Sequence, residues 1–207
     1  MSDPRTTLVA AGYDTMVETW EAWKAQIRDD PREVWRDELV ARLPAGARVV
    51  ELGCGGGTEE TRVLAERFRL TGVDLSEEQL RRARRRVPAA RFVHADLTDL
   101  ELAPGSVDAV ASFYVFNHVP RELLEGVFQR IHGWLAPSGL LLATLGASDN
   151  PGWTGDWLGA PTYFSGFEPD TNRRLLAEAG FELLRDELVT IREPEGEATF
   201  HWVLARR

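Results

Sequence analysis

The side chains best able to do chemistry in this chain follow short apolar segments. Glu51 stands at the end of one such run, and four of the next residues are glycine, at Gly53, Gly55, Gly56 and Gly57. Glycine adopts positive φ and lets a backbone approach a ligand closely. A strand that enters such a loop, with a helix directly after it, forms a cradle for a nucleotide-like ligand. The sequence therefore predicts a small-molecule site at this loop.

Two more acids and a histidine occupy similar positions further along the chain. Asp74 and Asp96 each end a short apolar run, and His118 follows a third one. In open α/β sheets ligands bind at the carboxyl edge of the strands, so we expect these side chains to face the same site. An imidazole titrates near neutral pH and can take a proton from a hydroxyl or an amine, which makes His118 a candidate general base. A structural histidine that caps the next helix is the alternative interpretation.

Alternating strand-like and helical segments are needed to position these residues. Strand-like runs occur at 48–52, 70–73, 91–95, 107–113 and 139–145, and helical patterns at 59–68, after Ser76 and at 120–135. This alternation predicts a doubly wound α/β fold with right-handed crossovers. Two last runs, at 182–192 and 199–205, flank a turn and predict a hairpin. We therefore expect a mostly parallel seven-stranded sheet with an antiparallel C-terminal hairpin strand and helices on both faces.

Two segments lie outside this alternation within one predicted domain, 1–207. Residues 12–43 are predicted to be helical, with Asp30 as an N-cap and Pro31 as the first residue of the second helix, so 1–44 should form an N-terminal helical cap. Residues 146–168 are rich in aromatic side chains, Gly and Pro. Long loops in compact domains are usually functional, and we expect this one to be a lid over a small organic substrate. Bland core packing is the alternative.

The composition restricts the class of protein. A net charge of -9 argues against nucleic acid as a partner, and the five arginines of 81–86 are expected to form a solvated helix face. We expect no membrane partner, since no apolar run approaches the roughly 20 residues of a span and no secretory signal pattern is present. The single cysteine, Cys54, has no intrachain partner, which favours the cytoplasm. No spacing suits a metal ion, and either a monomer or a homodimer is expected.

These motifs together resemble a known family. Glu51-x-Gly53-x-Gly55-x-Gly57, Asp74 and Asp96-Leu97 are similar to the motifs of class I S-adenosylmethionine-dependent methyltransferases. The segments 113–120 and 135–139 resemble the later motifs of that family, and the resemblance runs from about Tyr13 to the C-terminus. The competing dinucleotide-binding fingerprint requires a third glycine where this chain has Thr58.

The resemblance implies S-adenosyl-L-methionine as the cofactor and S-adenosyl-L-homocysteine as the product. Glu51 would orient the loop or the ammonium group of the cofactor, and an acid at the end of a buried strand is costly unless it is paired. Asp74 would accept hydrogen bonds from the ribose hydroxyls, and Asp96 from the adenine amino group. The other implied cofactor-binding residues are Tyr13, Gly53, Cys54, Gly55, Gly57, Leu75, Leu97 and Phe113.

The acceptor is expected between the loop after 107–113 and the aromatic segment. The predicted acceptor-binding residues are Trp20, Tyr114, Asn117, His118, Trp153, Trp157, Tyr163 and Phe164. The resemblance implies transfer of a methyl group to O or N of a small metabolite by in-line displacement, with positioning as the main contribution of the protein. Two alternatives remain: a cofactor-binding regulatory or partner subunit without chemistry of its own, and a nicotinamide-dependent oxidoreductase.

Overall fold

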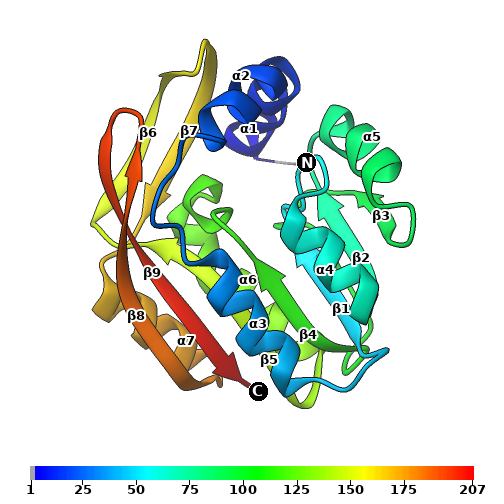
Figure 1. Cartoon of the computed structure of the whole chain (residues 1–207). Coiled ribbons are helices and arrows are strands. Elements are labelled where there is room, and N and C mark those ends of the chain that lie inside the picture. Colours follow the sequence, from blue (N-terminus) through cyan, green and yellow to red (C-terminus); the bar gives the residue numbers. More distant parts are fainter. Residues whose placement is uncertain (1–2) are drawn as a thin grey trace.

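A seven-stranded sheet forms the centre of the computed structural model, which describes residues 3–207 (Figure 1). Its strand order is β3-β2-β1-β4-β5-β9-β8. The strands are β1 (Arg48–Leu52), β2 (Arg69–Asp74), β3 (Arg91–His94), β4 (Val107–Ser112), β5 (Leu135–Gly146), β8 (Glu182–Glu193) and β9 (Gly196–Arg206). The first five pair in parallel, and β9 pairs antiparallel with both β5 and β8. The predicted fold class is confirmed.

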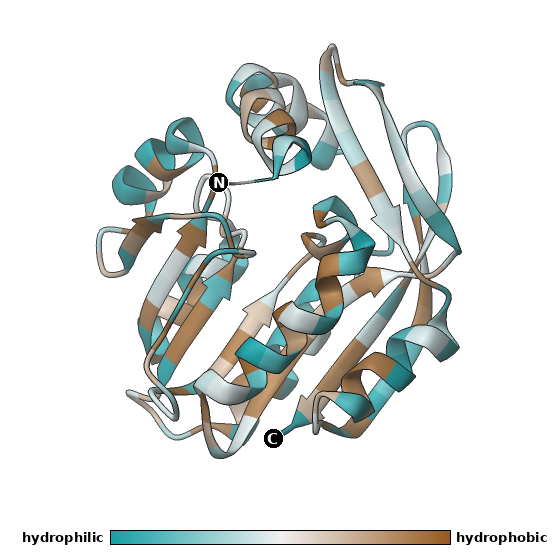
Figure 2. Cartoon of the chain, turned by 180° about the vertical axis from the view of Figure 1, so that it is seen from behind, coloured by the Kyte–Doolittle hydropathy of each residue, from teal (hydrophilic) through white to brown (hydrophobic). Residues whose placement is uncertain are grey.

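Helices cover both faces of this sheet. The helices are α1 (Pro4–Thr15), α2 (Val17–Lys24), α3 (Arg32–Arg42), α4 (Glu59–Arg67), α5 (Glu77–Arg86), α6 (Leu124–Trp134) and α7 (Pro169–Glu178). Helices α3 and α4 cover one face, and α6 and α7 the other; Figure 2 shows the second face from behind. Within 3–207, none of these helices is long and apolar enough to cross a membrane.

The positions of β4 and β5 in the core explain why their sequences are nearly continuous apolar runs. Both strands are central in the sheet and buried on both faces, as expected for parallel strands between two helix layers. On the α3 face, Trp35 stacks on Trp202 of β9 with ring centroids 5.6 Å apart. On the α6 face, Phe116 contacts Phe128 edge to face at 5.4 Å. These two layers hold the carboxyl ends of the strands rigidly in place.

Side-chain caps fix where the two helices next to the glycine loop begin. Thr58 forms a reciprocal capping box with Thr61 at the start of α4. Ser76 accepts a hydrogen bond from the backbone of Gln79 at the start of α5. Each cap satisfies helical N–H groups that have no partner within the helix. The predicted N-cap serine is confirmed.

The N-terminal helices begin elsewhere than predicted. Helix α1 starts at Pro4, with Asp3 as its N-cap, eight residues before the predicted position 12. Six of its twelve residues are Thr, Ala or Gly, so its apolar periodicity is weak. In α3, Pro31 is itself the N-cap position and makes no side-chain cap bond, while Asp30 accepts from the backbone of Arg32. Helix α3 packs on the sheet, so only α1 and α2 of the predicted cap lie over the strand ends.

The predicted aromatic loop at 146–168 is a β-hairpin instead. Strands β6 (Asn150–Trp157) and β7 (Ala160–Gly166) form a separate two-stranded sheet. Helix α1 packs directly on β7 beside it (Figure 1). The approach is close at Gly12, where an added Cβ would lie 2.5 Å from the Pro161 carbonyl oxygen. The hairpin and the cap helices α1 and α2 therefore pack together and form a single roof over the strand ends.

Candidate functional site

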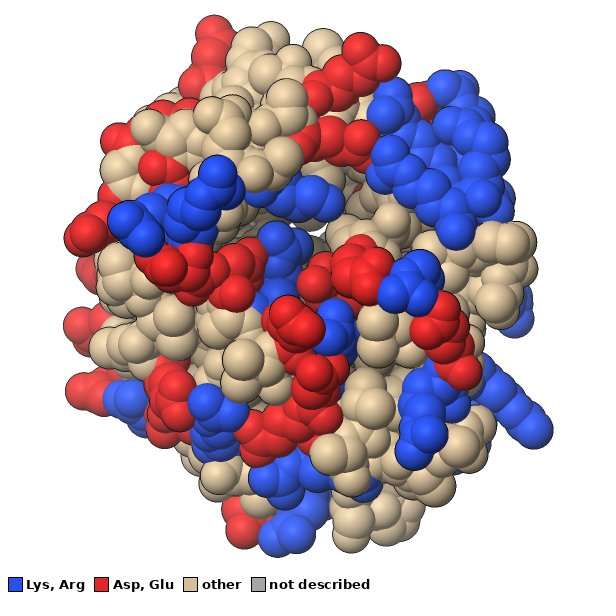
Figure 3. All heavy atoms as spheres, viewed as in Figure 1, with Lys and Arg blue, Asp and Glu red and all other residues tan. Residues whose placement is uncertain are grey.

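A cavity of ≈330 Å³ lies at the carboxyl ends of β1, β2 and β4. Helices α1 and α2, the β6–β7 hairpin and the turn end of β8 and β9 surround it. Figure 3 shows the molecule hollowed between the cap and the rest of the chain, with acidic and basic atoms around the opening. Open α/β sheets bind ligands at this edge, and the volume is in the range of small-molecule sites.

The glycine loop forms the floor of the cavity. Gly53, Gly55 and Gly57 all have positive φ, and Gly53 and Cys54 donate backbone hydrogen bonds to the Val73 carbonyl. A Cβ on Gly53 would lie 2.1 Å from the side chain of Val115. A Cβ on Gly55 would meet only Trp20 and Gln79, two other cavity residues, at 3.9 and 4.0 Å. Gly55 thus leaves its backbone open to a ligand.

Glu51 is a buried acid with one oxygen that lacks a partner. The side chain is 2% exposed and lines the cavity. One oxygen accepts a hydrogen bond from the Thr61 hydroxyl at 3.2 Å, while Oε2 is buried and has no hydrogen-bond partner within residues 3–207. Burial raises the pKa of Glu51 to about 8. Since an unpaired buried acid is costly, this position fits a ligand that brings a positively charged donor.

The two predicted nucleoside-binding acids are held differently. Asp74 accepts from the backbone N–H groups of Gly55 at 2.8 Å and Ser76 at 2.9 Å. Burial raises the pKa of Asp74, opposed by these backbone donors. Asp96 accepts from Thr98 through Oδ1, whereas its Oδ2 is buried and has no partner among the described residues. A carboxylate has about four acceptor sites, so both acids retain capacity for a ligand.

Two neutral amides at the cavity also have unsatisfied atoms. Gln79 is 1% exposed, and neither atom of its amide has a hydrogen-bond partner in the described chain. The Oδ1 atom of Asn117 is likewise buried and has no hydrogen-bond partner among the described residues. Because buried polar groups are nearly always hydrogen-bonded, such a concentration at one cavity indicates a polar ligand. Sequence analysis missed Gln79, since a glutamine in the first turn of an amphipathic helix carries no distinctive signal.

Lys24 and Arg32 form a second group that the sequence did not reveal. Lys24 is the only lysine of the chain, lines the cavity, and lies over the Trp20 ring at 4.5 Å. No carboxylate of residues 3–207 pairs with it, and burial, followed by the charge of Arg32, lowers its pKa. Arg32 pairs with Asp30 at 2.7 Å and lies over the Tyr114 ring. The one signal in the sequence that could have singled out Lys24 is that it is the only lysine in a chain with many arginines.

His118 is fixed from both sides of its ring. The Tyr163 carbonyl oxygen lies 2.9 Å from Nδ1, and the Tyr13 hydroxyl 2.9 Å from Nε2. Because a carbonyl only accepts, Nδ1 must carry the proton and donate, and Nε2 then accepts from Tyr13. The ring is buried, which lowers its pKa to about 4. Neutral imidazole is therefore the form present near pH 7.

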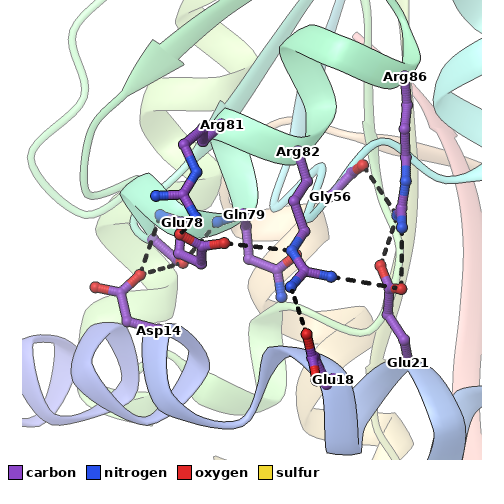
Figure 4. Close-up of polar contacts among 10 residues, drawn as sticks. Asp14, Glu18, Glu21, Gly56, Glu78, Gln79, Arg81, Arg82 and Arg86 are labelled. Carbon is purple, nitrogen blue, oxygen red and sulfur yellow. Dashed lines mark hydrogen bonds and ion pairs between the residues drawn. The ribbon is translucent and has the colours of Figure 1, made fainter.

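Polar contacts join the cap to α5 across the glycine loop (Figure 4). Arg86 forms an ion pair with Glu21 of α2 and donates to the Gly56 carbonyl at 3.3 Å. Arg82 lies within 3.5 Å of Glu18. Arg81, Arg84, Arg85 and Arg86 are exposed, as predicted for a solvated arginine face, whereas Arg82 is partly buried. Arg82 and Arg86 position α2 over the loop.

The structure brings most of the predicted site residues together. The cavity is lined by Tyr13, Trp20, Glu51, Gly53, Gly55, Asp74, Leu75, Leu97, Phe113, Tyr114, Asn117, His118, Trp157 and Phe164. Cys54 instead packs its thiol against Gly72 beneath the loop, and Gly57 packs on Ala83 of α5. Asp96 lies just outside the lining, between Ala95 and Leu97, which belong to it.

Two aromatic residues predicted to bind the acceptor lie away from the cavity. Trp153 is 45% exposed on β6. Tyr163 is buried on β7, where its ring lies under the Arg5 guanidinium. Because side chains alternate along a strand, Tyr163 lies on the face opposite its neighbour Phe164. Trp153 pairs with Phe164 on the same face but is not part of the cavity lining. The geometry gives those two predictions no support.

Comparison with known proteins identifies the family. Residues 49–139 match the family model described as a methyltransferase domain. A trans-aconitate 2-methyltransferase from Paracidovorax citrulli is 41% identical over 123 residues, which are 55% of this chain and 45% of that protein. The putative methyltransferase YqeM of Bacillus subtilis is 30% identical over 118 residues, 54% of this chain and 47% of that protein. The matched part thus spans less than half of these curated relatives.

Solved structures agree on the fold over nearly the whole chain. Magnesium protoporphyrin IX methyltransferase from Synechocystis PCC 6803, with bound SAM, superposes with a TM-score of 0.76 at 19% identity, covering 100% of this chain and 98% of that one. A 1,6-didemethyltoxoflavin-N1-methyltransferase from Burkholderia thailandensis gives 0.72 at 22% identity, covering 100% and 91%. The resemblance to class I S-adenosylmethionine-dependent methyltransferases is thus confirmed: residues 49–139 match a methyltransferase domain, and the whole chain shares the fold of these solved enzymes.

Proposed function

We propose that this protein binds S-adenosyl-L-methionine in the glycine-loop cavity and transfers its methyl group to a small molecule. The observation that carries the proposal is the unpartnered Oε2 of Glu51, a buried acid beside an open glycine backbone. The α-ammonium group of the cofactor would satisfy this oxygen. A metabolite without a positively charged donor would leave the Glu51 carboxyl protonated and this oxygen without a partner.

The other unsatisfied groups fit the rest of the same molecule. Lys24 and Arg32 would hold the carboxylate of the amino-acid part, opposite Glu51. Asp74 and Gln79 would bind the ribose hydroxyls, and Asp96 Oδ2 would accept from the adenine amino group. Acceptors thus face the ammonium, hydroxyl and amino groups, and donors face the carboxylate. This matching of charge along one cavity supports the cofactor over a nicotinamide dinucleotide, which offers no ammonium group.

The residues of the chain would then contribute mainly by positioning. When bound, the cofactor would supply a methyl group on a positively charged sulfur: an oxygen or nitrogen lone pair of the acceptor would attack the methyl carbon in line, and S-adenosylhomocysteine would leave. Rings of the roof, Trp20 and Phe164 among them, exclude water, and the fixed strand ends align the reactants. Such alignment can contribute about 7–11 kcal/mol to a bimolecular reaction. A base is needed only when the acceptor carries a proton at its reacting atom.

His118→Ala is expected to lower kcat by about 10²-fold, with the affinity for S-adenosylhomocysteine within twofold of wild type. The bond from the Tyr13 hydroxyl to Nε2 would let a proton pass through Tyr13 to the imidazole. Tyr13→Phe should therefore cost as much, and the double variant no more than either single one. Since its pKa is about 4, the imidazole stays unprotonated, so the rate should not fall between pH 8 and 5 through this group. Unchanged kcat in His118→Ala would exclude the base role.

A product assay separates this proposal from a cofactor-binding subunit without chemistry. Wild-type protein, S-adenosylmethionine and a panel of small hydroxyl, amine and carboxylate compounds are incubated, and S-adenosylhomocysteine is measured. The proposal predicts acceptor-dependent formation of S-adenosylhomocysteine and of a methylated product. Tight cofactor binding with no product from any acceptor class would favour the regulatory subunit. The proposal includes a cytoplasmic location, which suits the lone buried thiol of Cys54.

A further inference from the structure

Six aromatic rings form a series around the cavity, an aromatic collar that begins beside the glycine loop, where Trp20 lies next to Gly55. Consecutive ring centroids lie 6.0 Å apart for Trp20 and Tyr13, 5.3 Å for Tyr13 and His118, and 4.6 Å for His118 and Phe164. The series continues at 5.5 Å to Trp157 and 5.1 Å to Trp23. All six residues line the cavity. Because Trp20 and Trp23 are three residues apart on α2, the series begins and ends on one helix.

The far end of this collar is fixed at the turn between β8 and β9. The indole Nε1 of Trp23 donates to both carboxylate oxygens of Glu195, at 2.9 and 2.7 Å. Two residues away, Glu193 lines the cavity and is half-buried. No hydrogen-bond donor or cation within residues 3–207 pairs with the Glu193 side chain. Burial, and then the charge of Glu195, raises its pKa.

The charges of the cavity divide into two groups. Among the described residues, the charged side chains that line it are Lys24, Arg32, Glu51, Asp74 and Glu193. The first four are used by the cofactor in the proposed function. Glu193 is the one that remains for the acceptor, and it lies outside the residues 49–139 that match the family model. Because Lys24 already lies over the Trp20 ring at the glycine-loop end, the part left for the acceptor combines the other five rings of the collar with the single negative charge of Glu193.

We propose that the acceptor is an amine or a basic nitrogen heterocycle that binds in its protonated form, held by the aromatic collar and the Glu193 carboxylate, and that releases this proton to solvent before the freed nitrogen lone pair attacks the methyl carbon and S-adenosylhomocysteine leaves. Aromatic faces attract a cation through the ring quadrupole, most strongly for tryptophan, and two of the five rings that Lys24 does not cover, Trp23 and Trp157, are tryptophans. A neutral or anionic acceptor would leave Glu193 without a partner or facing a like charge. This inference rests on the proposed function, since it assigns the amino-acid end of the cavity to the cofactor.

Binding of three matched probes tests the inference. Calorimetric titrations are made at pH 7 with S-adenosylhomocysteine saturating, using phenethylamine as the cation, 2-phenylethanol as the neutral analogue and 3-phenylpropanoate as the anion. Phenethylamine is expected to bind at least tenfold more tightly than the other two. Glu193→Gln should reduce that preference to less than twofold. The matched control is Glu197→Gln, which removes an exposed carboxylate from the same hairpin and should keep the full preference.

Three outcomes would overturn the inference while S-adenosylhomocysteine still binds. These are an unchanged preference in Glu193→Gln, tighter binding of 3-phenylpropanoate than of phenethylamine, and no binding of phenethylamine at millimolar concentration. Normal S-adenosylhomocysteine affinity in each variant shows that it has folded. If S-adenosylhomocysteine itself fails to bind the wild-type protein, the proposed function is wrong, and that failure is distinct from the other three.

Discussion

Asp74→Ala is expected to weaken S-adenosylhomocysteine binding by at least a hundredfold. Its carboxylate connects the end of β2 to the glycine loop through Gly55 and to the start of α5 through Ser76. The two ribose hydroxyls would add two charge-assisted hydrogen bonds of about 1.5–3 kcal/mol each on binding, so their loss reaches the roughly 2.7 kcal/mol of a hundredfold change. Asp74→Asn keeps the shape and one acceptor oxygen and should lose less.

Asp108→Ala is the matched control for this prediction. Asp108 likewise accepts from a backbone N–H and from side-chain donors, all of Arg48, but it lies at the opposite, amino end of the sheet. We expect it to lower the midpoint of thermal unfolding and to leave S-adenosylhomocysteine affinity unchanged. A dissociation constant within threefold of wild type in Asp74→Ala would show that this acid does not bind the cofactor.

Glu51→Gln is expected to stabilise the free protein and to weaken its binding of S-adenosylhomocysteine. The pKa of Glu51 is about 8 in the folded chain against an ordinary value of 4.5, so the folded state holds a proton that the unfolded state loses. The contribution of this group therefore makes the free energy of unfolding fall as pH rises from 4.5 to 8. A neutral amide removes that dependence. Chemical unfolding at pH 8 should give a higher free energy of unfolding for Glu51→Gln than for wild type, by a few kcal/mol.

The same substitution should change how cofactor affinity depends on pH. A bound ammonium group favours the charged carboxylate, so cofactor binding releases the Glu51 proton below pH 8. Wild-type affinity for S-adenosylhomocysteine should accordingly rise from pH 6 to pH 8. Glu51→Gln should bind at least tenfold more weakly and show a flat profile over this range. If the variant binds as tightly as wild type, or if its affinity keeps the wild-type dependence on pH, Glu51 does not bind the ammonium group.

The sheet and the glycine loop were predictable because local signals agree with the tertiary structure there. The apolar run 48–52 is β1 without change of bounds, and Ser76 caps α5 as its position before two acids indicated. Strand ends were found because Asp74 interrupts an apolar run at the sheet edge. The turn at 193–196 was found because Gly and Pro interrupt two strand-like runs.

The roof of the site was less predictable because long-range contacts determine it. Helix α1 lacks a strong apolar stripe and is held by β7, 150 residues away in sequence, so its start at Pro4 was missed. The aromatic residues at 146–168 suggested a lid, but alternation along β7 puts Tyr163 on the face opposite Phe164, and Trp153, which pairs with Phe164 on the same face, lies outside the cavity lining. Lys24 and Gln79 were missed because their lack of partners is visible only in three dimensions.

The central claim is that the glycine-loop cavity holds S-adenosylmethionine, and one calorimetric experiment tests it most directly. The wild-type protein is titrated at pH 8 with S-adenosylhomocysteine and, separately, with NAD. The structure predicts saturable one-to-one binding of S-adenosylhomocysteine, lost in Asp74→Ala, and no measurable heat with NAD. Tight binding of NAD without binding of S-adenosylhomocysteine would contradict the account.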